Sequence, residues 1–197
     1  NPFDINLTGE GLTGNQDWEQ QFFGTTDGSG DAAPTADPNQ NGISNLLEYA
    51  LGGDPVGGGT GQEILPKLSI NPTAHCAEFS LTRYLDRDDL ILTVQATDSL
   101  PGPWTNLAWS VHGAPFTALA AGAVVTETGT GATRAVTVCD LYQTTDPAHP
   151  KRFMRLVVSN ENFPTTGLVA HYRFNGNADD SVGTLHGTVN GATLTTN

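Results

Sequence analysis

Residues 37–48 read DPNQNGISNLLE, and the spacing of their oxygen-bearing side chains constrains the chain more than any other feature. Calcium loops of twelve residues supply ligands from positions 1, 3, 5, 7, 9 and 12, with a Gly at position 6 for the sharp turn. Gly42 and Glu48 stand at positions 6 and 12 of this segment. The predicted Ca²⁺ ligands are the backbone carbonyl of Ile43 and the side chains of Asp37, Asn39, Asn41, Asn45 and Glu48, with Asn45 binding directly or through water. The alternative is an Asn- and Gly-rich turn that only precedes a helix.

The residues around the loop predict a short helix on its C-terminal side only. Residues 25–36 are rich in Gly, Asp and Pro and are not expected to form a helix before the loop. Apolar residues at helical spacing begin inside the loop, namely Ile43, Leu47, Ala50 and Leu51. Gly52 stands where a C-terminal cap belongs, and Pro55 prevents continuation. Because a helix of about two turns is not stable alone, the ion and the apolar stripe must hold it.

The stretch from Asp37 to Pro55, DPNQNGISNLLEYALGGDP, resembles the dockerin-like and thrombospondin type 3-like calcium repeats of large secreted bacterial proteins. The resemblance implies that the metal is structural and that the short helix packs on a following β-sandwich. This chain has Asn39 and Asn41 where those repeats commonly have Asp. A site with two formal charges rather than four is expected to bind calcium weakly, as extracellular modules do.

Composition and charge point to an extracellular or cell-surface protein. The 197 residues include 8 Lys and Arg against 21 Asp and Glu, which gives a formal net charge of -13. So acidic a chain is not expected to bind nucleic acid or anionic lipid, and it favours cations as partners. No long apolar run is present, so no membrane span is expected.

Cys76 and Cys139 are the only cysteines, and both lie in strand-like stretches. In a secreted chain the pair is expected to form one disulfide that closes a large loop, worth up to about 4 kcal/mol in the chain-entropy model. The alternative is two separate buried thiols. Metal binding by the pair is not expected, because no second pair and no His at ligand spacing accompanies it.

The sequence patterns divide the chain into three parts. Residues 1–61 form an N-terminal segment with the EF-hand-like calcium loop and short helices, one of them carrying Trp18, Phe22 and Phe23 on one face. Residues 62–160 alternate between apolar and polar positions and contain regular turn signals. We therefore expect a mainly β fold, an antiparallel β-sandwich of immunoglobulin or fibronectin type. The stretches LTVQATDSLPGPWTNL and KRFMRLVVS resemble a sandwich that often follows such calcium repeats.

Residues 161–197 form the third part, in which GLVAHYRFNGNADDSVGTLHGTVNGATL resembles the opening of a laminin-G-like or concanavalin-type jelly roll. One apolar strand face is predicted there, made of Leu168, Ala170, Tyr172 and Phe174. A complete fold of that family is far longer, so we expect a C-terminal β-hairpin extension. A lone hairpin is marginal in water and leaves two edges free. It is expected to pack on a neighbouring copy, on its own sandwich, or on the rest of a larger domain.

The sequence predicts no catalytic site. It lacks the G-x-S-x-G and H-E-x-x-H motifs and a phosphate-binding glycine loop, and its histidines show no ligand spacing. Asp86, Asp88 and Asp89 form a carboxylate cluster in which a glycosidase pair is conceivable. A solvated hairpin turn is the expected role of this cluster. Further carboxylates flank the predicted calcium loop and could serve a second ion or fill empty coordination positions of the first, namely Asp27, Asp31 and Asp54.

The sequence is compatible with three functions, of which an enzyme is the least expected. The favoured hypothesis is a non-enzymatic extracellular structural or adhesive protein, stabilised by calcium and self-associating through its C-terminal strands, as in a filament. The alternative is an ancillary carbohydrate-binding module of a secreted hydrolase, in which Trp104 and Trp109 would stack on a sugar ring. The structural role expected of such tryptophans is to cover the end of a core.

Overall fold

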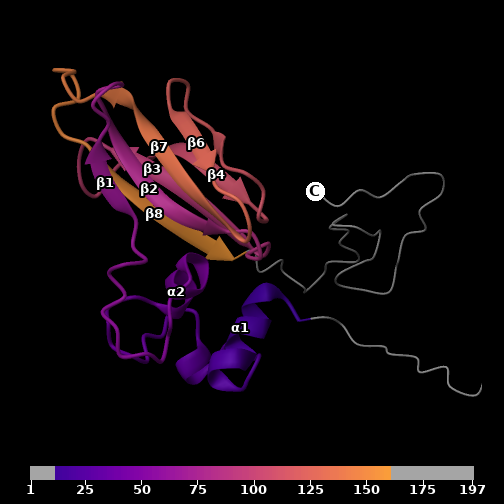
Figure 1. Cartoon of the computed structure of the whole chain (residues 1–197). Coiled ribbons are helices and arrows are strands. Elements are labelled where there is room, and N and C mark those ends of the chain that lie inside the picture. The colour runs from indigo at the N-terminus through magenta and orange to yellow at the C-terminus, as the bar shows by residue number, and fades with distance from the viewer. Residues whose placement is uncertain (1–11, 161–197) are drawn as a thin grey trace, which may run out of the picture. The chain divides into compact units, whose positions relative to one another are not determined.

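The computed structural model describes residues 12–160, which belong to one compact unit (Figure 1). The predicted C-terminal hairpin, at residues 161–197, lies outside the described residues. The elements in chain order are α1 (Gly14–Phe23), the 3-10 turn η1 (Gly30–Ala32), α2 (Asn45–Leu51), β1 (Lys67–Ile70), β2 (Cys76–Tyr84), β3 (Leu90–Thr97), β4 (Thr105–Val111), β5 (Thr117–Ala118), β6 (Val124–Thr128), β7 (Thr133–Gln143) and β8 (Phe153–Asn160).

The strands form two four-stranded antiparallel sheets, with the orders β1-β2-β7-β6 and β5-β4-β3-β8. The two sheets share one core, to which β2 of the first sheet contributes Phe79 and Leu81 and β3 of the second contributes Leu92 and Val94. The predicted mainly β fold, an antiparallel sandwich, is therefore confirmed. Alternation sets which face is buried, because successive side chains of a strand point to opposite faces. In β3 every second residue is buried, namely Leu90, Leu92, Val94 and Ala96.

The first predicted helix is confirmed as α1, and its ends follow from local chemistry. Thr13 and Gln16 form a capping box, in which the Gln16 amide donates to the Thr13 hydroxyl and the Thr13 amide donates to the Gln16 side chain. Gly24 ends the helix at a φ of 70°. Trp18 is buried, with its ring centroid 5.7 Å from that of Tyr49. The aromatic face of α1 therefore packs into the core, as its spacing predicts.

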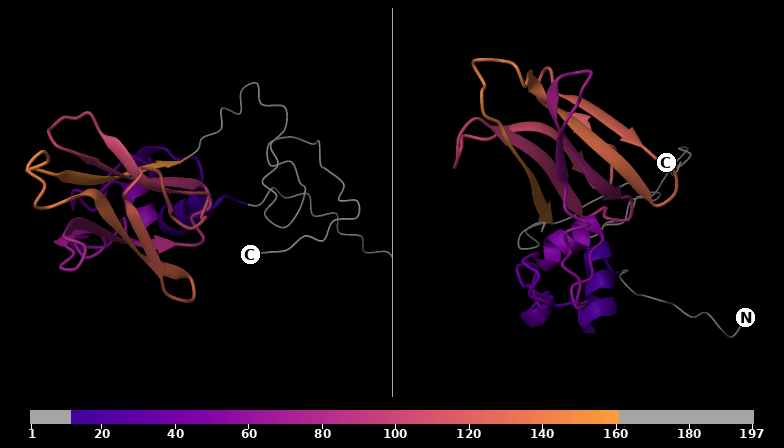
Figure 2. Two further views of the ribbon diagram at one scale, coloured as in Figure 1. Left: turned by 90° about the horizontal axis from the view of Figure 1, so that it is seen from above. Right: turned by 60° about the vertical axis from the view of Figure 1, so that its left-hand side comes forward.

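The second predicted helix is confirmed as α2, and Gly52 ends it for two reasons. Its φ of 78° favours glycine, and a Cβ there would lie 2.2 Å from the Tyr84 hydroxyl oxygen. Tyr49, Ala50 and Leu51 are buried in the same core cluster as the strand residues. The two helices consequently close one end of the sandwich, which Figures 1 and 2 show from three sides.

Hydrogen bonds around the buried Tyr49 connect the two helices to the turn between β2 and β3. The Tyr49 hydroxyl donates to Asp89 Oδ1 at 2.7 Å, and the Asn15 amide donates to Asp89 Oδ2 at 2.9 Å. Arg87 donates from Nε to the Tyr49 carbonyl at 2.8 Å, and its guanidinium lies 4.4 Å from the Tyr49 ring centroid. Burial, followed by the charge of Asp89, raises the pKa of the Tyr49 hydroxyl. The expectation of a solvated turn is therefore wrong for Asp89, which is buried because it accepts hydrogen bonds from both helices.

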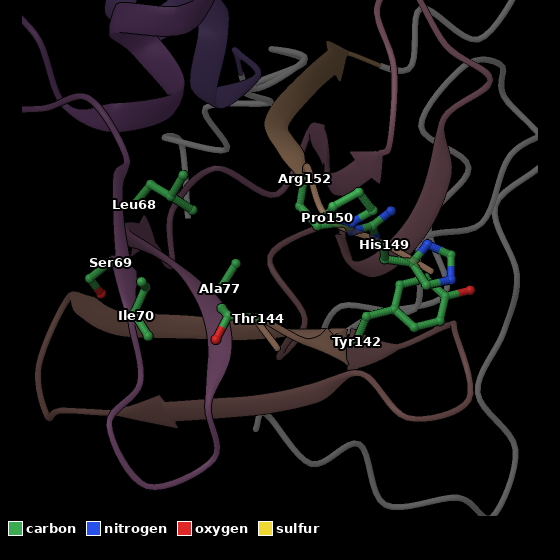
Figure 3. A pocket seen from close by; sticks show the side chains of 9 residues that line it. All are labelled: Leu68, Ser69, Ile70, Ala77, Tyr142, Thr144, His149, Pro150 and Arg152. Atoms are coloured by element: carbon green, nitrogen blue, oxygen red, sulfur yellow. The ribbon is translucent and has the colours of Figure 1, made fainter. Parts of the chain in front are cut away.

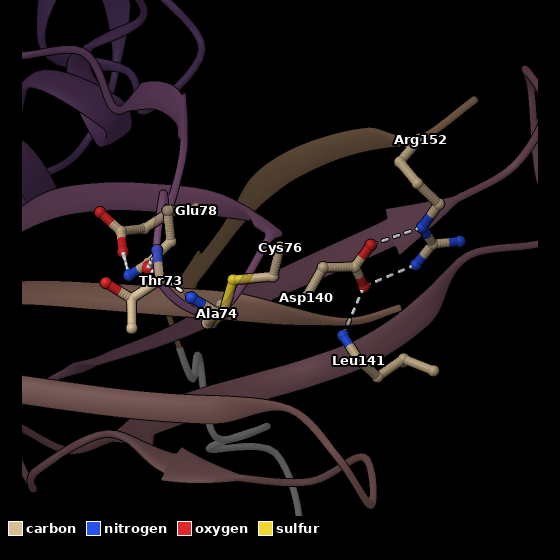
Figure 4. The surroundings of a disulfide bond; sticks show 9 residues. Thr73, Ala74, Cys76, Glu78, Asp140, Leu141 and Arg152 are labelled. Carbon is tan, nitrogen blue, oxygen red and sulfur yellow. Dashed lines mark hydrogen bonds and ion pairs between the residues drawn. A yellow bond between two sulfur atoms is a disulfide. The ribbon is translucent and has the colours of Figure 1, made fainter. Parts of the chain in front are cut away.

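The predicted disulfide between Cys76 and Cys139 is confirmed, with the two Cα atoms 5.8 Å apart (Figure 4). It joins β2 to β7, which are neighbours in one sheet. The next residue of β7, Asp140, is buried and holds Arg152 through two hydrogen bonds of 2.6 and 2.8 Å. The hydrogen bonds that Arg152 donates to that carboxylate raise the pKa of its guanidinium. The disulfide therefore joins two strands of one sheet, and the ion pair connects Arg152, the residue before β8, to β7 of the other sheet.

Candidate metal centre

In the calcium loop predicted at residues 37–48, side-chain oxygens accept hydrogen bonds from backbone N–H groups of the same loop. The Asp37 carboxylate accepts from the Asn41 amide at 3.1 Å and from the Gly42 amide at 2.8 Å. Asn41 Oδ1 in turn accepts from the Ile43 amide at 2.8 Å. Gly42 has a φ of +86°, the left-handed region that a tight loop requires and that favours glycine. These hydrogen bonds hold the loop in a defined conformation. Its last residue, Glu48, belongs to α2.

Glu48 is the most unusual residue of this loop, because it is a carboxylate with an exposed fraction of only 1%. Its Oε1 accepts hydrogen bonds from the side-chain nitrogens of Asn39, at 3.2 Å, and of Asn41, at 2.9 Å. Its Oε2 is buried and has no hydrogen-bond donor among residues 12–160. A buried carboxylate without a cationic partner is costly, whereas a divalent cation would compensate its charge. The donor set thus fits a hard cation with oxygen ligands.

The structure brings three of the predicted ligands together, because the side-chain nitrogens of Asn39 and Asn41 both donate to Glu48 Oε1. Asp37 lies at the start of the same loop. Across residues 12–160, His, Cys, Asp and Glu side chains form no group of three or more that could hold a metal. The predicted site has two carboxylates and takes its other ligands from amides and a carbonyl. Calcium, supplied with these oxygens, would join the loop to the helix.

Asn45 has a different environment from the other predicted ligands. Its side-chain nitrogen donates to the carbonyls of Asp31 at 2.7 Å and Ala33 at 2.9 Å. The side chain is buried, and its Oδ1 has no partner within the described part of the chain. These bonds anchor the start of α2 to η1. A role for Asn45 in binding calcium stays a prediction.

The carboxylates predicted to flank the loop have local partners. Asp54 accepts from the Val56 and Gly57 amides, and its carbonyl accepts from Asn39 at 2.8 Å. Hydrogen bonds from Ser29 hold the pKa of the Asp27 carboxyl below its usual range. A second ion at these residues stays a prediction.

Glu19 of α1 is a buried carboxylate that the sequence patterns did not single out. It accepts from the Asn15 side chain and from the Gly28 amide. Burial, opposed by these hydrogen bonds and aided by the charges of Asp27 and Asp89, raises the pKa of the Glu19 carboxyl. The sequence did not predict this burial, because a charged residue of an amphipathic helix is expected to face solvent.

Replacing Glu19 by Gln is expected to change how stability depends on pH. A raised pKa means that the folded state binds the proton more tightly, so stability from this group is full below the ordinary Glu pKa. That contribution is lost as the pH rises through the raised folded pKa. The variant cannot ionise, so its free energy of unfolding relative to the parent should rise across this window. Urea unfolding with chelator, from pH 4 to 7, measures the difference, and a difference independent of pH would contradict the assignment.

A second candidate site is a pocket of about 310 Å³ at the open edge of the sandwich, called here the edge pocket (Figure 3). Leu68 and Ile70 of β1 line one side, and Tyr142, His149 and Arg152 line the other. Leu68 pairs with the buried Phe79, so it lies on the core face of its sheet. Leu68 and Ile70 nevertheless remain 57% and 65% exposed. The core face of β1 is therefore left without cover among the described residues.

The polar wall of the edge pocket is occupied by its own ion pairs. Asp98 bridges Arg152 at 3.0 Å and His149 at 2.9 Å, and these bonds lower the pKa of the Asp98 carboxyl. The His149 ring stacks on Tyr142, with centroids 3.4 Å apart and planes inclined by 10°. Because Arg152 is taken by Asp140 and Asp98, it is not a free anion-binding group. The pocket accordingly suits an apolar side chain better than a charged ligand.

Neither of the tryptophans of the sandwich covers the end of the core. Trp104 lies in the turn before β4, where its Nε1 donates to the Pro101 carbonyl at 2.6 Å. Trp109 lies on the outer face of β4 and is 41% exposed. The expected role in covering the core is therefore wrong for both, since the core at this level is filled by Leu107 and Ala108.

Comparisons with family models, with curated proteins and with solved structures found no match for this chain. Within residues 12–160, no helix is long and apolar enough to cross a membrane.

Proposed function

We propose that this chain is a non-enzymatic structural or adhesive module of an extracellular or cell-surface assembly, stabilised by calcium. The observation that carries the proposal is the environment of Glu48, which is buried in the predicted loop with one oxygen lacking a donor among the described residues. A cation bound there would neutralise the carboxylate in a site that otherwise offers only amide hydrogen bonds.

The position of the loop supports a structural role for the ion. Glu48 belongs to α2, whose Tyr49 donates to Asp89 in the turn between β2 and β3. Calcium would therefore tie the loop, the helix and the sandwich together. A site with two carboxylates suits the calcium concentrations met outside cells. The disulfide between Cys76 and Cys139 also favours an oxidising compartment.

The aspartates of the β2–β3 turn support the absence of catalysis. Asp86 pairs with Arg87 at 2.8 Å, and Asp89 accepts from Tyr49 and Asn15. A glycosidase needs one carboxyl free as an acid and another as a nucleophile or base. Asp89 is committed to holding the helices, so the turn is better suited to a structural role.

Self-association through strand addition is the second element of the proposal. β1 and β8 are edge strands, each hydrogen-bonded to one neighbour among the described strands. An edge strand with exposed apolar residues can accept a further strand, and pockets beside it then select alternate side chains. The proposed occupant is the stretch from Leu168 to Phe174 of a second copy. Its alternating apolar residues would place every second side chain toward the edge pocket. That stretch lies outside the described residues.

The proposal is tested by sedimentation velocity of the full chain over a range of concentrations, with calcium and with chelator. The parent is expected to associate, and more strongly with calcium, because the ion stiffens the module. Leu68→Asp/Ile70→Asp should sediment as a monomer, because charged side chains in the edge pocket would oppose the packing of apolar residues from a second copy. Deleting residues 164–197 should have the same effect while leaving the β-sheet circular dichroism intact.

A matched control is Val124→Asp, a similar charge on an exposed residue of β6, the other edge of the same sheet. It should associate as the parent does. A parent that stays monomeric at high concentration, or a Leu68→Asp/Ile70→Asp variant that associates normally, would overturn the proposed self-association.

A further inference from the structure

The outer face of the sheet β5-β4-β3-β8 combines an exposed indole with a hydrogen-bonded polar row. Trp109 of β4 pairs with Thr93 of β3 on one side and Thr117 of β5 on the other. Trp109 is 41% exposed and lies between these two hydroxyl-bearing neighbours. An aromatic face bordered by hydroxyl groups can contact a partner that is apolar on one side and polar at its rim.

The polar row runs across three strands beside Trp109 and consists of Asn106, Gln95 and Arg155, which are register partners. Gln95 donates to Asn106 Oδ1 at 2.7 Å and accepts from Arg155 Nε at 2.8 Å. The Arg155 guanidinium lies 3.9 Å from the Trp104 ring centroid. These contacts fix the side chains in advance, so that less conformational entropy is lost when a ligand binds.

The row keeps donors available. In the described part of the chain, the amide nitrogen of Asn106 and the terminal nitrogens of Arg155 have no hydrogen-bond acceptor. An apolar protein surface placed here would bury these donors unsatisfied, at a cost. A ligand rich in hydroxyl groups would satisfy them.

Charge narrows the class of ligand further. The four strands of this sheet contain no Asp or Glu, although the chain has 21 of these residues. Arg155 is their only charged residue, and it lies over the Trp104 ring with its Nε donating to Gln95. The face therefore offers no carboxylate for a cationic ligand and no cluster of cations for a strongly acidic one.

We infer that this face is a binding site for uncharged polysaccharides. The apolar side of a pyranose ring stacks on Trp109, and its hydroxyl groups bond the row formed by Asn106, Gln95 and Arg155. An exposed sheet face is open at both ends, so it suits an internal stretch of a long chain. This inference depends neither on the calcium site nor on self-association.

The test is affinity gel electrophoresis of the full chain in gels that contain hydroxyethylcellulose, laminarin, xylan, mannan or, as the acidic arm, alginate. At least one neutral polysaccharide is expected to retard the parent. Trp109→Ala should weaken binding about tenfold or more, as truncation of a central aromatic anchor does. Trp109→Phe should retain most of the affinity, because it keeps an aromatic face.

Asn106→Asp gives a second variant that does not depend on the indole, since it can keep its bond from Gln95 but loses the amide donor. It should bind more weakly than the parent. Val124→Ala removes an exposed apolar side chain from the opposite sheet and should bind as the parent does. Absence of retardation by every neutral polysaccharide, retardation by alginate alone, or equal binding by Trp109→Ala and the parent would each overturn the inference.

Discussion

Replacing Glu48 by Gln is expected to abolish most of the stabilisation that calcium gives the folded chain. The Gln side chain has nearly the same shape, but it carries no charge and cannot bind the ion through two carboxylate oxygens. In the parent, calcium at a hundred times its Kd should stabilise the fold by about 2.7 kcal/mol. For a domain of this size that corresponds to a rise in Tm of roughly 5–10 °C. Thermal unfolding followed by circular dichroism, with calcium and with chelator, measures both shifts.

The same experiment makes a second, opposite prediction in chelator. There the parent retains a buried carboxylate with one oxygen lacking a donor, whereas the variant carries no buried charge. Glu48→Gln should therefore be at least as stable as the parent without calcium and less stable with it. Glu63→Gln, the same substitution at an exposed position, is the control and should respond to calcium as the parent does. Equal calcium shifts in Glu48→Gln and the parent would show that the ion binds elsewhere or not at all.

Removing the disulfide should have an effect of similar or larger size. The bond joins residues separated by 63 positions, and the chain-entropy model assigns a loop of that length about 4 kcal/mol. Cys76→Ala/Cys139→Ala should therefore lower the free energy of unfolding by about 4 kcal/mol, or the Tm by roughly 8–16 °C. Urea unfolding under non-reducing conditions measures this loss.

Non-additivity provides the control for the disulfide. Each single substitution already breaks the bond, so each should cost nearly as much as the double substitution rather than half of it. A reductant should bring the parent close to the double variant and should leave the double variant unchanged. A parent whose urea midpoint is insensitive to reductant would contradict the predicted contribution.

Much of the fold could be predicted because local chemistry and the tertiary structure agree. The capping box at Thr13 and Gln16 and the glycine at 52 define helix ends through contacts within a few residues. Alternation from Leu90 to Ala96 in β3 indicates a sheet with one buried face. These local patterns predict the structure correctly because the sandwich buries the same strand face that the pattern makes apolar.

The candidate sites show where local patterns stop being sufficient. Spacing placed Asp37, Asn39, Asn41 and Glu48 in one loop, since all of them lie within twelve residues. The same spacing gave no warning that Asn45 donates to carbonyls of the preceding turn. Asp89 was expected in solvent because its neighbours in the sequence are charged. Its actual partners, Tyr49 and Asn15, are 40 and 74 positions away.

The sequence by itself determined the alternation of the strands, the ends of the helices, the ligand-like spacing in residues 37–48 and the presence of two cysteines that could pair. Only the tertiary structure decided which groups lose contact with water. Folding buried the Glu48 carboxylate with one oxygen lacking a hydrogen-bond donor, and it left Leu68 and Ile70 exposed among the described residues. It also placed Trp109 on the same sheet face as Asn106, Gln95 and Arg155. The physical reason is that hydrogen bonding and side-chain geometry act over a few residues of sequence. Desolvation, in contrast, depends on every segment that packs nearby, however far away it lies in the chain.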